Sequence, residues 1–253
     1  MDNLCHTLVG AAMGEAGLKR RSGLAHAALM IGANLPDIDV LVFATSTPSV
    51  EFRRGWTHGV AAQVLLPVVL VLALLLVARR HDRAGQPVRP GWLLVCAYLG
   101  VYSHVFLDYL NNYGVRLLTP FDWRWFYGDA VFIVDPWLWA SLGLGVWMAR
   151  RRGRPHAAGW ALAVAALYIG GMLVSAQTAR ARVAEAWTSV AGAPPRAWMV
   201  GPVPVTPLRR TVIVDAGDHY RTGTYDVWRG EVSLDAARVE KHDRRVEVAH
   251  ARA

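Results

Sequence analysis

A histidine and a carboxylate lie four residues apart near the end of one apolar run. His104 and Asp108 belong to the stretch YSHVFLDYLNNY, residues 102–113, and in a helix this spacing puts both side chains on one face. An imidazole and a carboxylate one turn apart can bind a single divalent cation. Alternatively, the two side chains satisfy each other inside a helical bundle. The pair by itself leaves both interpretations open.

Other potential ligands occur earlier in the chain. Asp37 and Asp39 follow a proline in NLPDID, residues 34–39, and we expect a turn there that holds a bridging pair of carboxylates or an ordinary Asx turn. His58 precedes an apolar run, and His6 lies near the first residue. Such a His and Asp set without thiolates suits Zn, Mn, Fe or Mg. Two such ions side by side commonly hydrolyse phosphoesters.

The elements that must position these residues are membrane helices. Hydrophobic residues make up 54% of the 253 residues and charged residues 18%, whereas an average soluble domain has about 25% charged residues. Four runs have about the length of a bilayer-spanning helix. They are Val60–Ala78, Trp92–Leu110, Val131–Ala149 and Ala158–Ala176. Two shorter helices are expected before them, at Leu4–Leu18 and Gly23–Asn34.

The last part of the chain has a different composition. From Arg180 onwards, short β-branched runs alternate with Gly and Asp, which is typical of a small, mainly β module outside the membrane. We therefore predict a mainly α, multi-pass membrane bundle with four full spans and two short N-terminal helices, followed by this module. The expected domains are residues 1–178 and 179–253.

The distribution of basic residues predicts the orientation. The loops 79–89 and 150–154 are the two short basic connections and should be cytoplasmic. Alternate threading then puts the His and Asp residues named above, together with the C-terminal module, on the outer side. Arg53 and Arg54 also fall on that side, where they can contact an anionic substrate or lipid headgroups. Because the net charge of +8 gathers beside the spans, no nucleic-acid partner is expected.

Five short motifs in order carry a resemblance to a known family. They are His6, residues 34–39 (NLPDID), residues 54–59 (RGWTHG), the His104-x-x-x-Asp108 helix and residues 134–139 (VDPWLW). Together, over residues 1–176, they resemble the YdjM/YbcI family of bacterial inner-membrane metal-dependent hydrolases. That family is in turn distantly similar to zinc-dependent phospholipase C and related zinc nucleases.

The resemblance implies a set of site residues and a reaction class. The implied metal positions are His6, Asp37, Asp39, His58, His104 and Asp108, with Asp135 a looser candidate. The leading hypothesis is an inner-membrane hydrolase of a phosphoester or a lipid or envelope substrate. It uses a divalent metal, with Zn favoured over Mn, Fe or Mg. Asp37 or Asp39 would act as base or bridging ligand, and Arg53 or Arg54 would contact the anion.

Two other classes of function remain open at this point. In a proton- or ion-coupled transporter, buried His and Asp residues would carry the ion, although no inverted repeat is visible. In a non-enzymatic membrane scaffold, the C-terminal module would bind a partner. The expected partners are membrane lipid and a small-molecule or lipid substrate.

Overall fold

The computed structural model describes residues 1–46, 52–80 and 86–241. The chain divides into two compact units, Met1–Gly170 and Gly171–Ala253, and each is described by itself. Helix α7 (Pro155–Ala191) begins in the first unit and ends in the second. The predicted basic loop 79–89 lies partly outside the described residues, as do residues 242–253 of the predicted C-terminal module.

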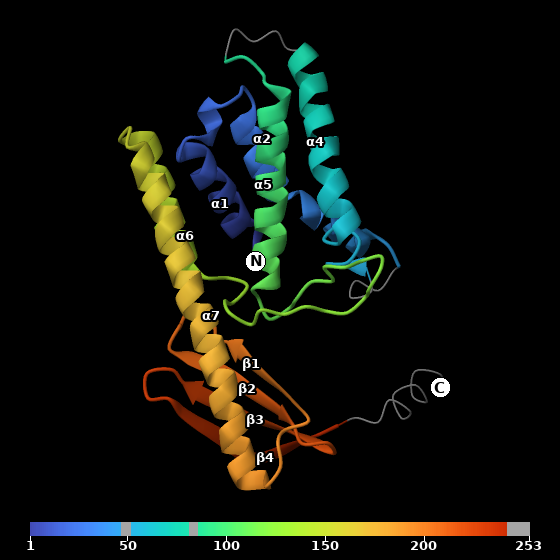
Figure 1. Cartoon of the computed structure of the whole chain (residues 1–253), viewed down its shortest axis with the longest axis vertical. Coiled ribbons are helices and arrows are strands. Elements are labelled where there is room, and N and C mark those ends of the chain that lie inside the picture. Colours follow the sequence, from blue (N-terminus) through green and yellow to red (C-terminus); the bar gives the residue numbers. More distant parts are fainter. Residues whose placement is uncertain (47–51, 81–85, 242–253) are drawn as a thin grey trace. The chain divides into compact units, whose positions relative to one another are not determined.

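The first unit is helical, and α5 lies at its centre. Helix α5 packs against α1, α2 and α4, and Figure 1 shows it beside α2 and α4. The described elements that precede α7 are α1 (Asn3–Glu15), η1 (Leu18–Arg20), α2 (Ala25–Gly32), η2 (Leu35–Ala44), α4 (Val60–Arg80), α5 (Pro90–Tyr109) and α6 (Pro136–Arg151).

Two glycines let α2 and α5 approach closely enough to bring separate parts of the site together. A Cβ at Gly100 would lie 2.8 Å from the carbonyl oxygen of Leu29, and a Cβ at Gly32 would lie 3.0 Å from that of Ala97. Small residues at such crossings are the usual device for close helix packing in a membrane. His104, one turn after Gly100, can therefore reach the backbone at the end of α2.

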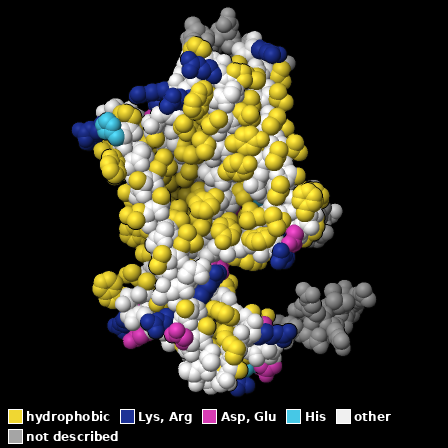
Figure 2. All heavy atoms as spheres, viewed as in Figure 1, with side chains coloured by type: hydrophobic (Ala, Val, Ile, Leu, Met, Phe, Trp, Pro, Cys, Tyr) yellow, Lys and Arg dark blue, Asp and Glu magenta, His cyan; other side chains and the backbone are white. Residues whose placement is uncertain are grey.

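The described residues contain three or four candidate spans, against the four predicted. Among the described residues, α4, α5 and α7 are long and apolar enough to cross a membrane, and α2 with η2 passes the same test as one helix bent by 46°. The described part of the chain therefore has three candidate spans, or four with the bent pair. Figure 2 shows hydrophobic side chains over the visible face of this unit, as expected of a lipid-facing surface.

The predicted third span, residues 131–149, begins too early. Helix α6 starts at Pro136, and the Asp135 carboxylate accepts hydrogen bonds from the backbone N–H groups of Trp137 and Leu138, at 3.0 and 3.1 Å. An Asp N-cap followed by Pro is a strong helix start, because Pro lacks an N–H that would go unpaired there anyway. Apolarity alone had extended the prediction through this signal.

Residues 35–44 form the 3-10 helix η2, where the sequence had predicted a turn. Pro36 lies in its first turn, where the missing N–H costs no internal hydrogen bond. Asp37 and Asp39 are both buried. The proline thus ends α2 but also begins a second helical segment, which carries the two carboxylates inward.

The second unit contains the small antiparallel sheet that the sequence predicted. Strands β1 (Ala197–Pro202), β2 (Arg209–Asp215), β3 (His219–Asp226) and β4 (Glu231–Glu240) pair in the order β1-β2-β3-β4. Val200, Val212 and Val214 of this sheet bury their side chains against Ala179 and Val183 of α7. The mainly α class with a C-terminal β module is therefore confirmed.

Candidate metal centre

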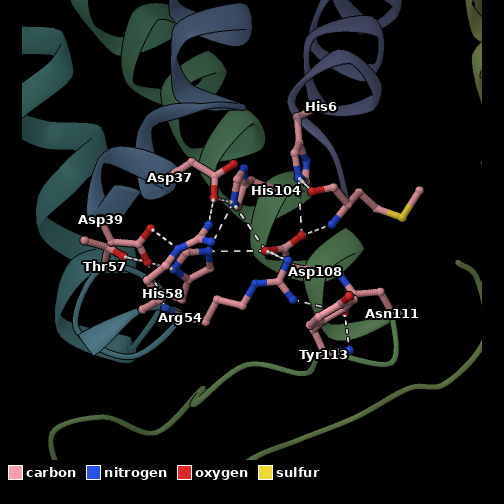
Figure 3. Close-up of polar contacts among 12 residues, drawn as sticks. His6, Asp37, Asp39, Arg54, Thr57, His58, His104, Asp108, Asn111 and Tyr113 are labelled. Atoms are coloured by element: carbon pink, nitrogen blue, oxygen red, sulfur yellow. Dashed lines mark hydrogen bonds and ion pairs between the residues drawn. The ribbon is translucent and has the colours of Figure 1, made fainter. Parts of the chain in front are cut away.

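Four side chains from three parts of the first unit converge on one buried point. Asp37 comes from η2, His58 from the turn before α4, and His104 and Asp108 from α5. Each offers one ligand atom, and the four atoms lie within 4.8 Å of one another. Figure 3 shows these side chains pointing toward each other. The one-face spacing of His104 and Asp108 thus brings both of them into the same cluster.

The backbone fixes which nitrogen of His104 faces the cluster. His104 Nδ1 lies 2.8 Å from the carbonyl oxygen of Ala33. A carbonyl only accepts, so Nδ1 carries the hydrogen and donates it. In the neutral ring, Nε2 then presents a lone pair to the cluster. Metal-ligating histidines usually donate their other ring N–H to a carbonyl or carboxylate in this way, which fixes the tautomer.

Two consecutive hydrogen bonds fix the orientation of His58 in the same way. Thr57 Oγ1 donates its hydrogen to Asp39 Oδ2 at 3.1 Å and lies 3.0 Å from His58 Nδ1. Because the hydroxyl has only one hydrogen, His58 Nδ1 must be the donor in the second contact. The neutral His58 ring therefore also presents its Nε2 lone pair to the cluster.

Two lone pairs now face each other. His58 Nε2 lies 3.1 Å from His104 Nε2, and two acceptors at this distance repel unless a proton or a metal ion binds them. Nitrogens bound to one tetrahedral Zn at about 2.05 Å lie about 3.3 Å apart. The spacing therefore fits two ligands of one ion.

The carboxylates complete a set of nitrogen and oxygen donors. Asp108 Oδ2 lies 3.4 Å from His58 Nε2 and 3.8 Å from His104 Nε2, and Asp37 Oδ1 lies 3.8 Å from His104 Nε2. Asp108 Oδ2 is buried and accepts no hydrogen bond within the described chain. The Arg54 guanidinium, with Nη2 3.3 Å away, offsets part of the cost of burying this oxygen, and a divalent cation would offset more. The residues present therefore fit a divalent cation.

His6 lies on the other side of Asp108. Its Nε2 is 3.3 Å from Asp108 Oδ1 and 3.2 Å from the Met1 carbonyl oxygen, and its ring stacks on His104 with centroids 3.8 Å apart. The Met1 amino group also contacts Asp108 Oδ1. Burial lowers the pKa of the His6 imidazole in α1, which favours its neutral form. His6 therefore borders the cluster and is not among the four residues whose ligand atoms converge.

Arg54 and Asp39 contact residues of the cluster or the groups that orient them. The buried Arg54 places Nη2 3.3 Å from Asp108 Oδ2 and donates from Nη1 to Asn111 Oδ1 at 3.0 Å. Its backbone N–H donates to Asp39 Oδ2 at 2.8 Å. Asp39 thus accepts the hydrogen bond from Thr57, whose hydroxyl oxygen in turn orients the His58 ring. The sequence had given no role to Thr57 or Asn111; the polar Asn at the end of an apolar helix was the available signal.

Asp135 lies apart from the four residues that converge. Its Oδ1 caps α6, and its Oδ2 accepts a hydrogen bond from the Tyr168 hydroxyl at 2.8 Å. Both oxygens therefore hold α6 and α7 in position, and the structure does not bring Asp135 into the cluster.

A cavity of about 730 Å³ opens beside the centre. Asp37, Arg53 and Arg54 line it together with Phe43, Tyr113 and Trp125. The Arg54 guanidinium lies 5.5 Å from the Tyr113 ring, and that of Arg53 lies 5.3 Å from the Phe43 ring. Guanidinium groups beside two carboxylates can bind an anionic ligand whose phosphate also contacts a metal ion.

The family of the chain follows from comparison with known sequences. The model of the family described as "YdjM inner membrane protein" matches residues 1–179. The chain belongs to the YdjM inner membrane protein family. The matched residues include the whole candidate metal centre of this YdjM member, and the family description agrees with its apolar helices in assigning it to the inner membrane.

The chain is also similar to a curated protein whose name gives no activity. The chain is 28% identical over 160 residues to the uncharacterized protein YfhP of Bacillus subtilis strain 168, a match that covers 59% of this chain and 47% of YfhP. It therefore spans about half the length of that relative. No solved structure matches the chain significantly.

Proposed function

We propose that this YdjM family member is a membrane-bound hydrolase that cleaves a phosphoester with a divalent cation held by Asp37, His58, His104 and Asp108. The observation that carries the proposal is the pair of Nε2 lone pairs 3.1 Å apart beside two buried carboxylates. Zinc is the favoured ion, because two imidazoles and two carboxylates suit it. Such an ion would make a water molecule more acidic and offset charge on a phosphate oxygen.

Three other residues would bind the phosphate or position the cluster. Arg53, whose side chain is 31% exposed, reaches into the cavity and can bind the phosphate. Arg54 contacts both Asp108 and the loop after α5, so it also fixes the wall of the cavity. Asp39 orients His58 through Thr57. These positions hold the phosphate next to the cluster and keep the imidazoles in one tautomer.

Asp37 is the better placed of the two η2 carboxylates to act as a base, because it lines the cavity. Its Oδ1 is the oxygen that lies 3.8 Å from His104 Nε2 and would hold the ion, which leaves Oδ2 to accept a proton. In the proposed reaction, the oxygen of a water molecule forms a bond to phosphorus, and the bond from phosphorus to the leaving oxygen breaks. Asp37 accepts the proton released by the water, and the leaving oxygen takes up a proton as it departs. The products are an alcohol and a phosphate with one ester bond fewer.

We further propose that the site and the C-terminal module face the outer side of the inner membrane. Helix α5 begins after Arg89 and ends near Asp108, and its 20 residues span about 30 Å. Lys19 and Arg20 of η1 and Arg150 and Arg151 of α6 are the other basic residues that support a cytoplasmic assignment of the opposite end.

Hydrolysis of model esters tests the reaction class. We expect purified protein supplied with Zn to hydrolyse p-nitrophenyl phosphate or bis-p-nitrophenyl phosphate, and Asp37→Asn to lower kcat about 100-fold or more. Asp122→Asn is the matched control, because Asp122 pairs with the exposed Arg124. Absence of hydrolysis of both esters by the metal-loaded wild type would contradict the proposal, as would full activity of Asp37→Asn.

A further inference from the structure

A second opening reaches the centre from between the helices. An apolar groove of about 530 Å³ lies between α1 and the α2–η2 segment. Met30, Ile31, Leu35 and Ile38 line it, and Asp37 is also part of its wall. Asp37 therefore borders both this groove and the cavity that holds the two arginines. Both openings therefore meet the cluster at the Asp37 carboxylate.

Two polar side chains in the middle of the groove already have partners. Asn34 Nδ2 donates to Thr7 Oγ1 at 3.0 Å and to the Met30 carbonyl oxygen at 2.9 Å. Thr7 Oγ1 in turn donates to the Asn3 carbonyl oxygen at 2.7 Å. Because Asn34 and Thr7 are already hydrogen-bonded, an apolar chain can lie beside them without taking away their partners.

The outer surface of η2 is apolar. Asp37 and Asp39 are buried, whereas Ile38, Leu41 and Phe43 are 49%, 64% and 61% exposed. Together with α2, this segment has the length and hydropathy of one bent span. The groove therefore opens on a surface that a bilayer would cover. A small water-soluble phosphate ester would use the cavity alone and leave the groove empty.

We infer that the substrate is a lipid phosphate ester whose hydrocarbon chain lies in the groove between α1 and α2–η2. This inference rests on the proposed function and names the substrate class of the same site. The phosphate reaches Arg53 and Arg54 in the cavity, and the chain extends from Asp37 along Ile31 and Ile38 into the bilayer. Water adds to phosphorus, the bond from phosphorus to the ester oxygen breaks, and that oxygen takes up a proton.

Photolabelling of the wild-type protein tests the groove without requiring activity. The probe is a phosphatidic acid with a diazirine in its acyl chain, presented in mixed detergent micelles to Zn-loaded and metal-free protein. We expect the label on peptides that contain residues 3–7 and 30–38. Ile31→Trp and Ile38→Trp fill the groove and should lower this labelling at least about fivefold. Leu144→Trp is the matched control, since Leu144 is 57% exposed in a separate apolar groove between α6 and α7.

Kinetics separates this inference from the function on which it rests. Ile31→Trp should lower kcat/KM for long-chain phosphatidic acid about tenfold or more and leave p-nitrophenyl phosphate hydrolysis within about twofold. Wild-type protein that hydrolyses p-nitrophenyl phosphate, but carries the label on other helices only, would overturn the lipid chain assignment and leave the hydrolase intact. Labelling of the groove without hydrolysis of any ester would overturn the hydrolase, and with it the role of the lipid as substrate.

Discussion

Removing the Thr57 hydroxyl should weaken metal binding although Thr57 is not a ligand. In Thr57→Val, His58 Nδ1 loses its acceptor at 3.0 Å, and Asp39 Oδ2 loses the hydrogen bond of 3.1 Å. The next carboxylate oxygen lies 3.6 Å from His58 Nδ1, which is too far for a good hydrogen bond. The His58 ring is then free to rotate or to change tautomer, and either change turns an N–H toward the cluster.

The expected size of this effect comes from the contact itself. Loss of a partner that orients a metal-bound histidine typically costs 10- to 100-fold in affinity, which is about 1.4 to 2.8 kcal/mol. One hydrogen bond to the ring and one to a buried carboxylate are lost, so we expect a value within this range. Val keeps the shape of Thr, and a packing defect is therefore not the cause.

Chelator competition in detergent measures the effect. Wild type, Thr57→Val and Thr188→Val are titrated with Zn against a chromophoric chelator, and the dissociation constants are compared. Thr188 is the control because its hydroxyl donates only to the Ala184 carbonyl oxygen within α7. A Thr57→Val constant within about twofold of the wild type would refute the proposed tautomer of His58 and the role of Asp39 behind it.

Three further predictions concern other parts of the chain. Arg53→Ala should raise KM for a phosphate ester about tenfold and leave the metal content unchanged, because Arg53 lies 3.4 Å from Asp39 and 3.8 Å from Asp37. Loss of the metal from this variant would instead show that Arg53 has a structural role. Gly100→Ala should lower Tm, since overpacking costs about 1–3 kcal/mol, whereas Gly143→Ala, with nothing within 4 Å, should not. A chain ending at Thr178 should still bind Zn, because the proposed boundary leaves every ligand before it; loss of Zn would show that the C-terminal module is needed.

The part of the site that lies on one helix could be read from the sequence. His104 and Asp108 are separated by one helical turn in a run that had to be helical, and the structure places both in α5 beside the cluster. Asp37 and His58 come from distant segments, so only the ordered motifs and the expected membrane level pointed to them. Their meeting depends on the close packing of α2 against α5 at Gly100.

The different roles of Asp37 and Asp39 could not be read from their spacing. In a 3-10 helix successive residues turn by about 120°, so two residues with one between them point in different directions. Asp37 therefore faces the cluster, while Asp39 faces the backbone of Arg54.

The sequence contains the signal for the start of α6, but the longer apolar run favoured an earlier start. Asp135 followed by Pro136 marks a helix start, but the apolar run through residues 131–149 favoured a longer span. The cap engages Asp135 Oδ1 and the Tyr168 hydroxyl engages Oδ2, so this residue lies apart from the four that converge.

The central claim is that the cluster holds a metal ion, and elemental analysis of detergent-purified protein tests it most directly. Wild type is compared with His58→Ala/His104→Ala and with the control His156→Ala/His219→Ala, which removes two histidines outside the cluster. The account predicts about one tightly bound transition-metal ion per chain in the wild type and the control, and its loss from the cluster variant. Wild-type protein that binds no ion when supplied with Zn, Mn or Fe would contradict it, and a proton would then occupy the space between His58 and His104.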